Sequence, residues 1–474
     1  MATQRAYELG FRSLDEGEEI ADFALSVEGS VPGWLSGSLI RNGPGRFAFG
    51  DERATHWFDG LAMLRRYAFE DGEIRYSNRF LRTSAYADAA RGKTAGEFAH
   101  DGGSVRELLR WLKAFGPPEP TDNANVHVAH LGDHYVALTE APRRIAFDPV
   151  TLETLGEFRW NDDVVEHLST AHLTVDPVRG ETVGYSTELG RSPRYHLYRI
   201  PDDTVIRERI ASIPAEGPGY IHDCSVTANH VVLVETPLRI ALLRALLPWN
   251  EGLLGMLQYD EARQTRFIVV DRDTGHVVTE PRTDAFFTFH HINAFDDGEC
   301  VVIDLVEYEN DDIVGSLAFD RLAEDAFATA PDGQFVRYRL DTETGLVDRS
   351  ERYDGGLELP TVPRDVRGTE YRYAYAQVTD RRGANGLVKL DVSSGTATEW
   401  WESGVYVEEP RMIQHPDGDG EDDGVVIAPA LDTHSAESVL LLFDAATLTE
   451  RARASLPHAL PFGFHGRFFS KARR

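Results

Sequence analysis

The stretch Val270-Asp271-Arg272-Asp273-Thr274-Gly275 ends an apolar run with an aspartate and a polar turn that closes on a glycine. The same unit recurs at Phe147–Thr151, Leu340–Gly345, Leu390–Gly395 and Phe443–Thr447. From Asp271 onward its aspartates are 70, 50 and 53 residues apart (271 to 341, 341 to 391 and 391 to 444). Hairpins repeated at this period predict the blades of a β-propeller. Generic hairpin turns in another large β-protein are the alternative that the pattern leaves open.

The rest of the chain is also typical of an all-β protein. Short runs rich in Val, Ile, Tyr and Phe, such as Val301–Val306 and Ser438–Phe443, alternate with turn clusters of Asp, Gly and Thr. The chain has 474 residues, 42% of them hydrophobic, which is enough for a sizeable core. Because no Pro/Gly/Ser-rich linker divides it, we predict a single domain over residues 1–474.

Composition excludes several classes of protein. The formal net charge of -30 repels phosphate backbones, so nucleic acid is a poor partner. Two cysteines provide neither a disulfide framework nor a multi-cysteine metal site, and they fit a reducing cytoplasm. The acidic, lysine-poor and arginine-rich composition favours a halophilic protein adapted to a high-salt cytoplasm. An ordinary acidic protein from a GC-rich genome is the alternative.

Two leucine-rich segments interrupt the strand pattern. Residues 105–115 carry leucines at helical spacing and stop at two prolines, and residues 236–259 combine many leucines with Trp249. Both segments are candidates for helices buried against the propeller. Interfacial anchors, in which apolar side chains enter a membrane while arginines stay near the headgroups, are the alternative, and burial is the commoner outcome.

Four histidine positions have apolar or aromatic neighbours, which is unusual for a solvated histidine: His172, His222, the pair His290-His291, and His465. With His290 taken to represent the pair, successive positions are 50, 68 and 175 residues apart (172 to 222, 222 to 290 and 290 to 465). These are not zinc-finger spacings. They are the spacings expected if each histidine comes from a different blade and points at the central axis. Imidazole suits several divalent metals, so the ligand type alone leaves the metal open.

A series of motifs runs through nearly the whole chain: Leu39–Gly45, His56–Gly60, Asn78–Thr83, Thr121–Val126, Thr139-Glu140, Phe289–Asn293, Glu421–Gly424 and Phe464–Gly466. Each motif alone is weak, but together their order and number resemble the carotenoid cleavage oxygenase family, and closest of all its animal-type branch. That branch contains the β-carotene oxygenases and the retinal pigment epithelium isomerohydrolase.

The resemblance implies a seven-bladed β-propeller with a small helical cap over the iron-bearing face. It also implies one Fe(2+) per chain, held by four histidines: His172, His222, His290 and His465. His290 is selected over His291 because the family ligand stands three residues before an asparagine, here Asn293. His291 is then expected to be structural.

The resemblance also implies three carboxylates that accept hydrogen bonds from the second, third and fourth ligands: Glu140, Glu358 and Glu409. Such a carboxylate fixes the tautomer of a ligating imidazole and raises its basicity. His172 has no such partner in the pattern, and Glu408 is expected to be a solvated turn residue. Val126 matches a position whose side chain crowds one of the two open positions on the iron.

The implied reaction is the addition of O2 across a C=C bond of a carotenoid or apocarotenoid, followed by cleavage to aldehyde products such as retinal from β-carotene. A substrate of this kind is drawn from a bilayer, which favours the interfacial interpretation of residues 236–259 and keeps residues 105–115 as a second candidate. We therefore expect a cytoplasmic protein with peripheral membrane contact.

Four other functions compete with this one. A stilbene-cleaving dioxygenase of the same fold recognises a phenol with a Tyr and a Lys, and the relevant half of this chain offers only Lys93 and Lys113. The isomerohydrolase activity of the animal-type branch uses the same four-histidine motif. A non-catalytic propeller that binds a ligand or partner would lack turnover. A propeller lactonase would use carboxylate and amide ligands for a hard cation, which four histidines disfavour.

Overall fold

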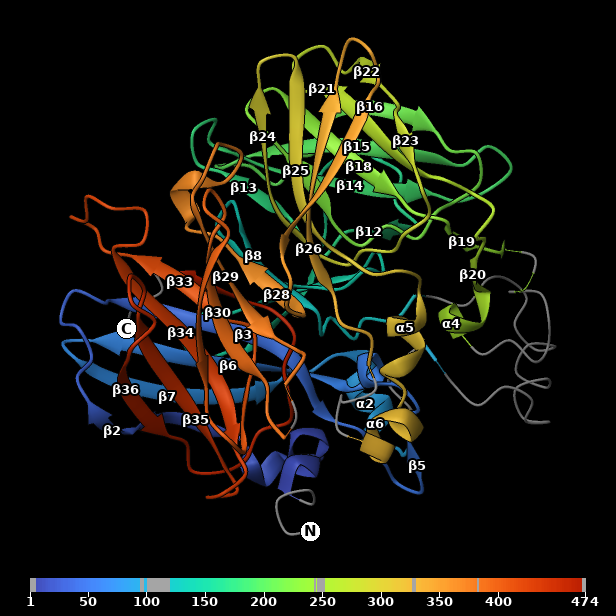
Figure 1. Cartoon of the computed structure of the whole chain (residues 1–474). Coiled ribbons are helices and arrows are strands. Elements are labelled where there is room, and N and C mark those ends of the chain that lie inside the picture. The colour runs from blue at the N-terminus through green and yellow to red at the C-terminus, as the bar shows by residue number, and fades with distance from the viewer. Residues whose placement is uncertain are drawn as a thin grey trace.

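The computed structural model describes residues 6–93, 98–99, 120–242, 244, 252–325, 330–381 and 383–470. Within them, seven sheets of four to six strands are arranged as the blades of a propeller (Figure 1). Two further sheets are short two-stranded ladders. The all-β class and the seven-bladed propeller are therefore confirmed.

The first four blades follow one another along the chain. Blade 1 contains β1 (Ile20–Ala24), β7 (Glu73–Phe80), β6 (Leu61–Glu70), β3 (Gly37–Arg46) and β37 (Gly466–Phe469). Blade 2 contains β11 (Thr154–Phe158), β10 (Arg144–Phe147), β9 (His134–Leu138) and β8 (His127–Leu131). Blade 3 contains β12 (Leu168–Ser169), β13 (Thr174–Asp176), β14 (Glu181–Glu188), β15 (Arg194–Pro201) and β16 (Glu208–Pro214). Blade 4 contains β17 (Cys224–Val226), β18 (His230–Glu235), β21 (Thr265–Asp271), β22 (Val277–Thr279) and β23 (Arg282–Thr283).

The last three blades complete the ring. Blade 5 contains β24 (His291–Asp297), β25 (Cys300–Glu307), β26 (Gln334–Asp341) and β27 (Val347–Tyr353). Blade 6 contains β28 (Leu357–Thr361), β29 (Tyr373–Val378), β30 (Gly386–Asp391) and β31 (Thr396–Trp401). Blade 7 contains β32 (Val405–Val407), β33 (Arg411–Gln414), β34 (Gly424–Asp432), β35 (Glu437–Asp444), β36 (Glu450–Ser455) and β2 (Ser26–Gly29).

The ring is closed twice, by strands from both ends of the chain. The N-terminal β2 pairs with β36 of blade 7, and the C-terminal β37 pairs with β3 of blade 1. Figure 1 accordingly shows the blue N-terminal strands beside the red C-terminal ones. Because closure joins segments more than 400 residues apart, it fixes the inner strand that follows His465 in its place.

The recurring aspartate turn is the outer hairpin of five blades. It joins β10 to β11, β21 to β22, β26 to β27, β30 to β31 and β35 to β36. The side chain of Asp271 accepts hydrogen bonds from the backbone of Asp273 (3.1 Å) and Thr274 (2.7 Å), and Asp341 does the same one blade on. Gly275 closes the turn at φ +70°, a conformation that a side chain disfavours. The sequence repeat is therefore a structural repeat.

The α-helices among the described residues lie on one side of the propeller, at the lower right of Figure 1. α4 (Gly252–Met256) is inserted after β18, whose end lies alongside the start of β17. α5 (Asp312–Ser316) and α6 (Phe319–Asp325) follow β25, whose end lies beside His290. α2 (Ser84–Ala89) follows β7, and the remaining short elements are η1 (Tyr7–Phe11), η2 (Glu16–Glu18), η3 (Trp57–Asp59), η5 (Arg364–Val366), β4 (Ala48–Phe49), β5 (Glu52–Arg53), β19 (Leu238–Ile240) and β20 (Leu257–Tyr259). The insertions after β18 and β25 thus rise from the same face as the histidines.

Residues 236–259 do not form one helix, which corrects that interpretation. β19 pairs antiparallel with β20, and α4 is the one α-helix described between them. Leu253, Leu254 and Met256 pack against a hydrophobic cluster of blades 4 to 6. The leucine content misled because strand residues such as Leu238 are buried in the same cluster. The second leucine-rich segment, residues 105–115, lies outside the described residues.

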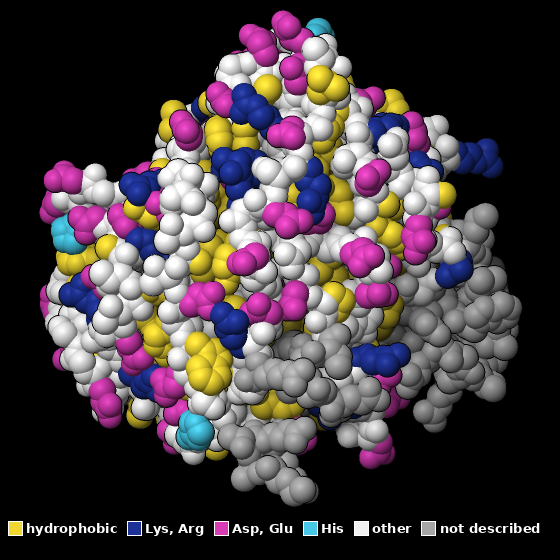
Figure 2. Space-filling model, viewed as in Figure 1, with side chains coloured by type: hydrophobic (Ala, Val, Ile, Leu, Met, Phe, Trp, Pro, Cys, Tyr) yellow, Lys and Arg dark blue, Asp and Glu magenta, His cyan; other side chains and the backbone are white. Residues whose placement is uncertain are grey.

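The surface carries the acidic excess of the chain. Acidic side chains are spread over the face seen in Figure 2, interspersed with fewer basic ones. Among the described residues, no helix is both long and apolar enough to cross a bilayer.

Candidate metal centre

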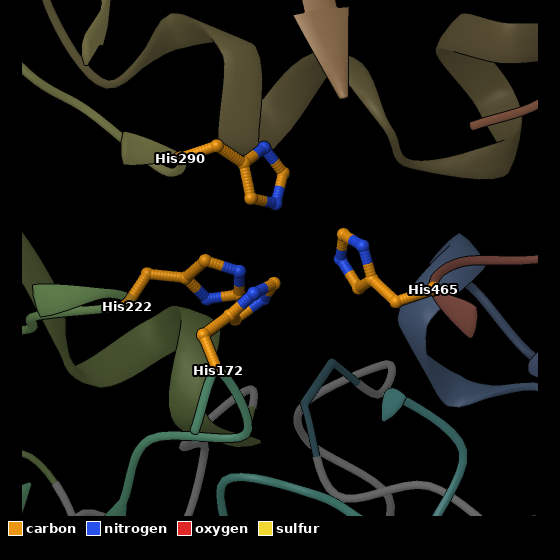
Figure 3. A group of neighbouring side chains, drawn as sticks. All are labelled: His172, His222, His290 and His465. Atoms are coloured by element: carbon orange, nitrogen blue, oxygen red, sulfur yellow. The ribbon is translucent and has the colours of Figure 1, made fainter. Parts of the chain in front are cut away.

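Four histidines from four blades converge on the propeller axis (Figure 3). His172 lies between β12 and β13, His222 just before β17, His290 directly before β24, and His465 directly before β37. One ring nitrogen of each lies within 4.8 Å of those of the other three. Contacts of β17 with β24 and of β37 with β8 place these strands at the inner edges of their blades. The spacing of the histidines along the chain predicted this arrangement.

Three of the histidines donate Nδ1–H to a buried or half-buried carboxylate. The Nδ1–carboxylate distance is 2.6 Å from His222 to Glu140, 2.6 Å from His290 to Glu358, and 2.8 Å from His465 to Glu409. These are the three pairs that the resemblance implied. Because Nδ1 keeps its proton for the carboxylate, each Nε2 is left bare to bind a metal.

His172 is the one member of the cluster with no carboxylate partner among the described residues. The Nε2 atoms of His172 and His290 are both buried, and neither has a hydrogen-bond partner among the described residues. Burial, followed by the neighbouring histidines, holds the pKa of His172 well below its usual value, and burial lowers that of His465 to about 4. An unprotonated imidazole with an orphaned nitrogen, as at His172, is what a divalent metal requires.

Two tyrosines orient two of the carboxylates, and sequence reasoning missed both. The Tyr220 hydroxyl lies 3.0 Å from both oxygens of Glu140, and the Tyr308 hydroxyl donates to Glu358 at 2.7 Å. The only available signal was that Tyr220 stands two residues before His222, on the same side of an extended chain. At Glu358 the phenol binds one carboxylate oxygen while the other receives the imidazole, whereas at Glu140 the phenol lies within reach of both oxygens.

Arginines replace the tyrosine at the third carboxylate. Glu409 receives Arg41 at 2.9 Å, Arg411 at 2.6 Å and the backbone N–H of Gly466 at 3.0 Å. Burial opposes the charge of Glu409, but Arg411, His465 and Arg41 outweigh it and lower the pKa of Glu409 to about 2. The His465–Glu409 pair is thus charge-compensated, whereas the other two pairs are supported by neutral phenols.

Glu408 is not the solvated turn residue expected from the sequence. It is 6% exposed, and it accepts hydrogen bonds from Arg41 (3.0 Å) and from the backbone N–H of Gly463 (2.9 Å). Two adjacent glutamates look like a solvated turn unless a buried arginine from elsewhere is known to face them. Arg41, 367 residues away, provides it.

His291 lies outside the cluster, as expected. Its Nδ1 is 2.7 Å from the Ser225 hydroxyl, and its backbone N–H donates to Asp223 at 3.1 Å. These bonds join β24 to the start of β17 and leave His291 turned toward blade 4.

Val126 lies beside the cluster at the start of blade 2. Its carbonyl accepts the backbone N–H of His465 at 3.2 Å, and its own N–H donates to Leu138 at 3.0 Å. Both backbone bonds fix its position next to a candidate ligand.

A fifth histidine borders the cluster and was missed from the sequence. The ring centroid of His127 lies 5.6 Å from that of His172 and 5.4 Å from that of His465. Its Nδ1 accepts the backbone N–H of Val128 at 2.7 Å, which leaves the proton on Nε2. It is therefore oriented as a neighbour of the cluster rather than as a member.

Three phenylalanine rings lie next to the histidines. The ring of Phe289 lies 5.1 Å from that of His222, and Phe58 lies 6.3 Å from Phe289 and 5.6 Å from Phe464. Phe289 and Phe464 each directly precede a histidine of the cluster. Aromatic surroundings of this kind favour an apolar ligand.

We expect Glu358→Gln to weaken metal binding by about 10- to 100-fold, because the amide holds the His290 tautomer less firmly. Competition with a chelator of known affinity would measure the loss. Tyr308→Phe should weaken it less, because Glu358 keeps its backbone donor Leu359. The matched control is Glu351→Gln on β27, whose side chain is 59% exposed. Equal affinities for the Glu358 and Glu351 variants would contradict the assignment.

Comparisons with known proteins agree over nearly the whole chain. A family model described as retinal pigment epithelial membrane protein matches residues 11–470. Similar proteins include β,β-carotene 15,15'-dioxygenase of Rattus norvegicus, 28% identical over 96% of this chain and 90% of that protein. Carotenoid cleavage dioxygenase 8 of Arabidopsis thaliana is 31% identical over 94% of this chain and 83% of that protein. A solved structure, cobalt-substituted apocarotenoid oxygenase of Synechocystis, is 25% identical with a TM-score of 0.86 and covers 98% of both chains.

Proposed function

Because the chain belongs to the carotenoid oxygenase family, whose relatives are carotenoid-cleaving dioxygenases, we propose that it is an iron(II) dioxygenase acting on a carotenoid or apocarotenoid. The products are two aldehydes, formed by cleavage of one C=C bond. The observation that carries this proposal is the convergence of four imidazoles, three of them held by carboxylates, on a bare central position. We propose residues 1–474 as one catalytic domain.

The four histidines, His172, His222, His290 and His465, are proposed to hold Fe(2+). All four are neutral donors, so the metal keeps its full positive charge in the absence of a carboxylate ligand. When bound, Fe(2+) supplies the dioxygen activation that no side chain of the site provides. Glu140, Glu358 and Glu409 would orient the imidazoles through Nδ1, and the side chain of Val126 would restrict access to the metal.

The protein's remaining task is to hold one double bond of a long polyene beside the histidines. Phe58, Phe289 and Phe464 are the apolar side chains proposed to contact it there, because their rings pack together next to His222. No side chain is required to transfer a proton, because the proposed reaction joins O2 to carbon and breaks a C–C bond without net proton exchange.

Substrate supply and cellular setting extend the proposal. A polyene is delivered from a membrane, and we keep residues 236–259 as the proposed peripheral contact, although Leu253, Leu254 and Met256 pack inward. A cytoplasmic location and adaptation to high salt rest on composition alone and stay predictions.

The test is aerobic incubation of iron-loaded protein with β-carotene and with apocarotenals, followed by mass analysis of the products. Retinal would place the cleavage at the centre of β-carotene, and other chain lengths would move it. We expect oxygen-dependent aldehyde formation that disappears without O2. Absence of an aldehyde from any polyene, with iron bound, would refute the dioxygenase and favour a non-catalytic binding module; a stilbene substrate cleaved in its place would favour that branch.

A further inference from the structure

Arginines gather at the inner edges of blades 6, 7 and 1. Arg364 and Arg367 lie at η5, between β28 and β29; Arg411 begins β33; and Arg467 is the second residue of β37. β33 contacts both β37 and η5, so these segments are neighbours. Arg467 follows His465 by two residues in extended chain, which places both side chains on the same, axial side.

Few of these guanidinium groups are paired with a carboxylate among the described residues. Among the described residues, the Arg367 side chain has no hydrogen-bond or ion-pair partner, and the Arg467 side chain donates only to the carbonyl of Leu173, at 2.9 Å. Arg411 alone has a carboxylate, the Glu409 oxygen at 2.6 Å. Partly buried guanidiniums without partners are unusual, because removing a charge from water is costly unless it is paired.

The acidic groups that face these arginines are already occupied. Glu409 receives His465, Arg41, Arg411 and the backbone of Gly466. Asp223 accepts the backbone N–H groups of Cys224 (2.7 Å) and His291 (3.1 Å). Positive charge therefore predominates on this part of the axis, although the chain as a whole has a net charge of -30. Burial and the charge of Arg411 accordingly lower the pKa of Arg367 to about 10.

We propose that Arg367, Arg411 and Arg467 form a binding site for a small oxyanion on the propeller axis, beside the four histidines. Guanidinium forks match two oxygens of one anion, which favours a tetrahedral or carboxylate oxyanion over a spherical ion. The site opens to solvent, since Arg364 is exposed and Arg367 and Arg467 are partly so. The site therefore combines neighbouring guanidinium donors, positive charge without a carboxylate partner, partial burial and access from solvent. The proposal rests on the fold and stands whether or not a polyene is cleaved.

The test measures the midpoint of thermal unfolding of the metal-loaded protein against sulfate, acetate and chloride at constant ionic strength. An anion that binds the folded state raises the midpoint as its concentration passes the dissociation constant. We expect one of the oxyanions to act at lower concentration than chloride. If sulfate raises the midpoint at the lower concentration, the site prefers tetrahedral oxyanions. If acetate does so, the site prefers carboxylates.

Matched variants separate site binding from general salt effects. Arg367→Gln removes a guanidinium without a protein partner, so it should fold normally and bind the oxyanion about tenfold or more weakly. Arg367→Lys should bind the oxyanion more weakly than the wild type and more tightly than Arg367→Gln, because lysine keeps the positive charge but lacks the forked guanidinium. The control is Arg159→Gln, whose side chain is 82% exposed. Equal effects of oxyanions and chloride on the wild type, or equal responses of the Arg367 and Arg159 glutamine variants, would overturn the proposal.

Discussion

His290→Ala is expected to abolish both metal retention and polyene cleavage, whereas His291→Ala should retain both. The two residues are adjacent, but only the Nε2 of His290 faces the other candidate ligands, and its Nδ1 is held by Glu358 at 2.6 Å. His291 faces Ser225 in the neighbouring blade. Removing one of four ligands leaves three imidazoles that no longer surround the ion, so the loss should approach completeness.

The measurement is metal content after dialysis, followed by aldehyde formation with an excess of added Fe(2+). His291→Ala is an unusually close control, because it removes the same side chain one residue away. A moderate loss of stability is expected from it, since Ser225 loses its partner. Metal-free His291→Ala together with metal-loaded His290→Ala would reverse the assignment of the third motif.

The blades could be predicted from the sequence because their signal is local. Asp271 and Asp341 cap turns through backbone atoms two and three residues away, so the turn residues alone reveal the hairpin. The histidines were predictable for a different reason. A propeller brings one inner strand per blade to the axis, and blade-scale spacing therefore becomes spatial convergence.

The supporting groups could not be predicted, because their signals are distant in the sequence. Tyr308 meets Glu358 across 50 residues, and Arg41 meets Glu408 across 367. Neither contact leaves a periodic trace in the chain. His127 lies next to the cluster only because blade 2 directs an inner strand there, and one histidine in a strand is ordinarily uninformative. Polar partners that are distant in the sequence can therefore be identified only once the closed ring of blades is known.

Arg41→Met is expected to destabilise the whole ring by about 3–5 kcal/mol, the cost of leaving a buried charge without its partner. Arg41 is fully buried, and its guanidinium joins Glu408, Glu409 and the carbonyl of Phe464. It therefore ties blade 1 to blade 7 at the point where the chain ends meet. Methionine fills much of the volume, so the loss reports on charge rather than on a cavity.

The measurement is the free energy of unfolding from urea denaturation at neutral pH, with Arg159→Met as the exposed control. Adding Glu408→Gln to Arg41→Met should recover part of the loss, because one of the two stranded carboxylates becomes neutral. Glu409 would still keep Arg411 and His465. A loss in Arg41→Met no larger than in the control would mean that water replaces the guanidinium, and that ring closure depends on the β2–β36 and β3–β37 ladders alone.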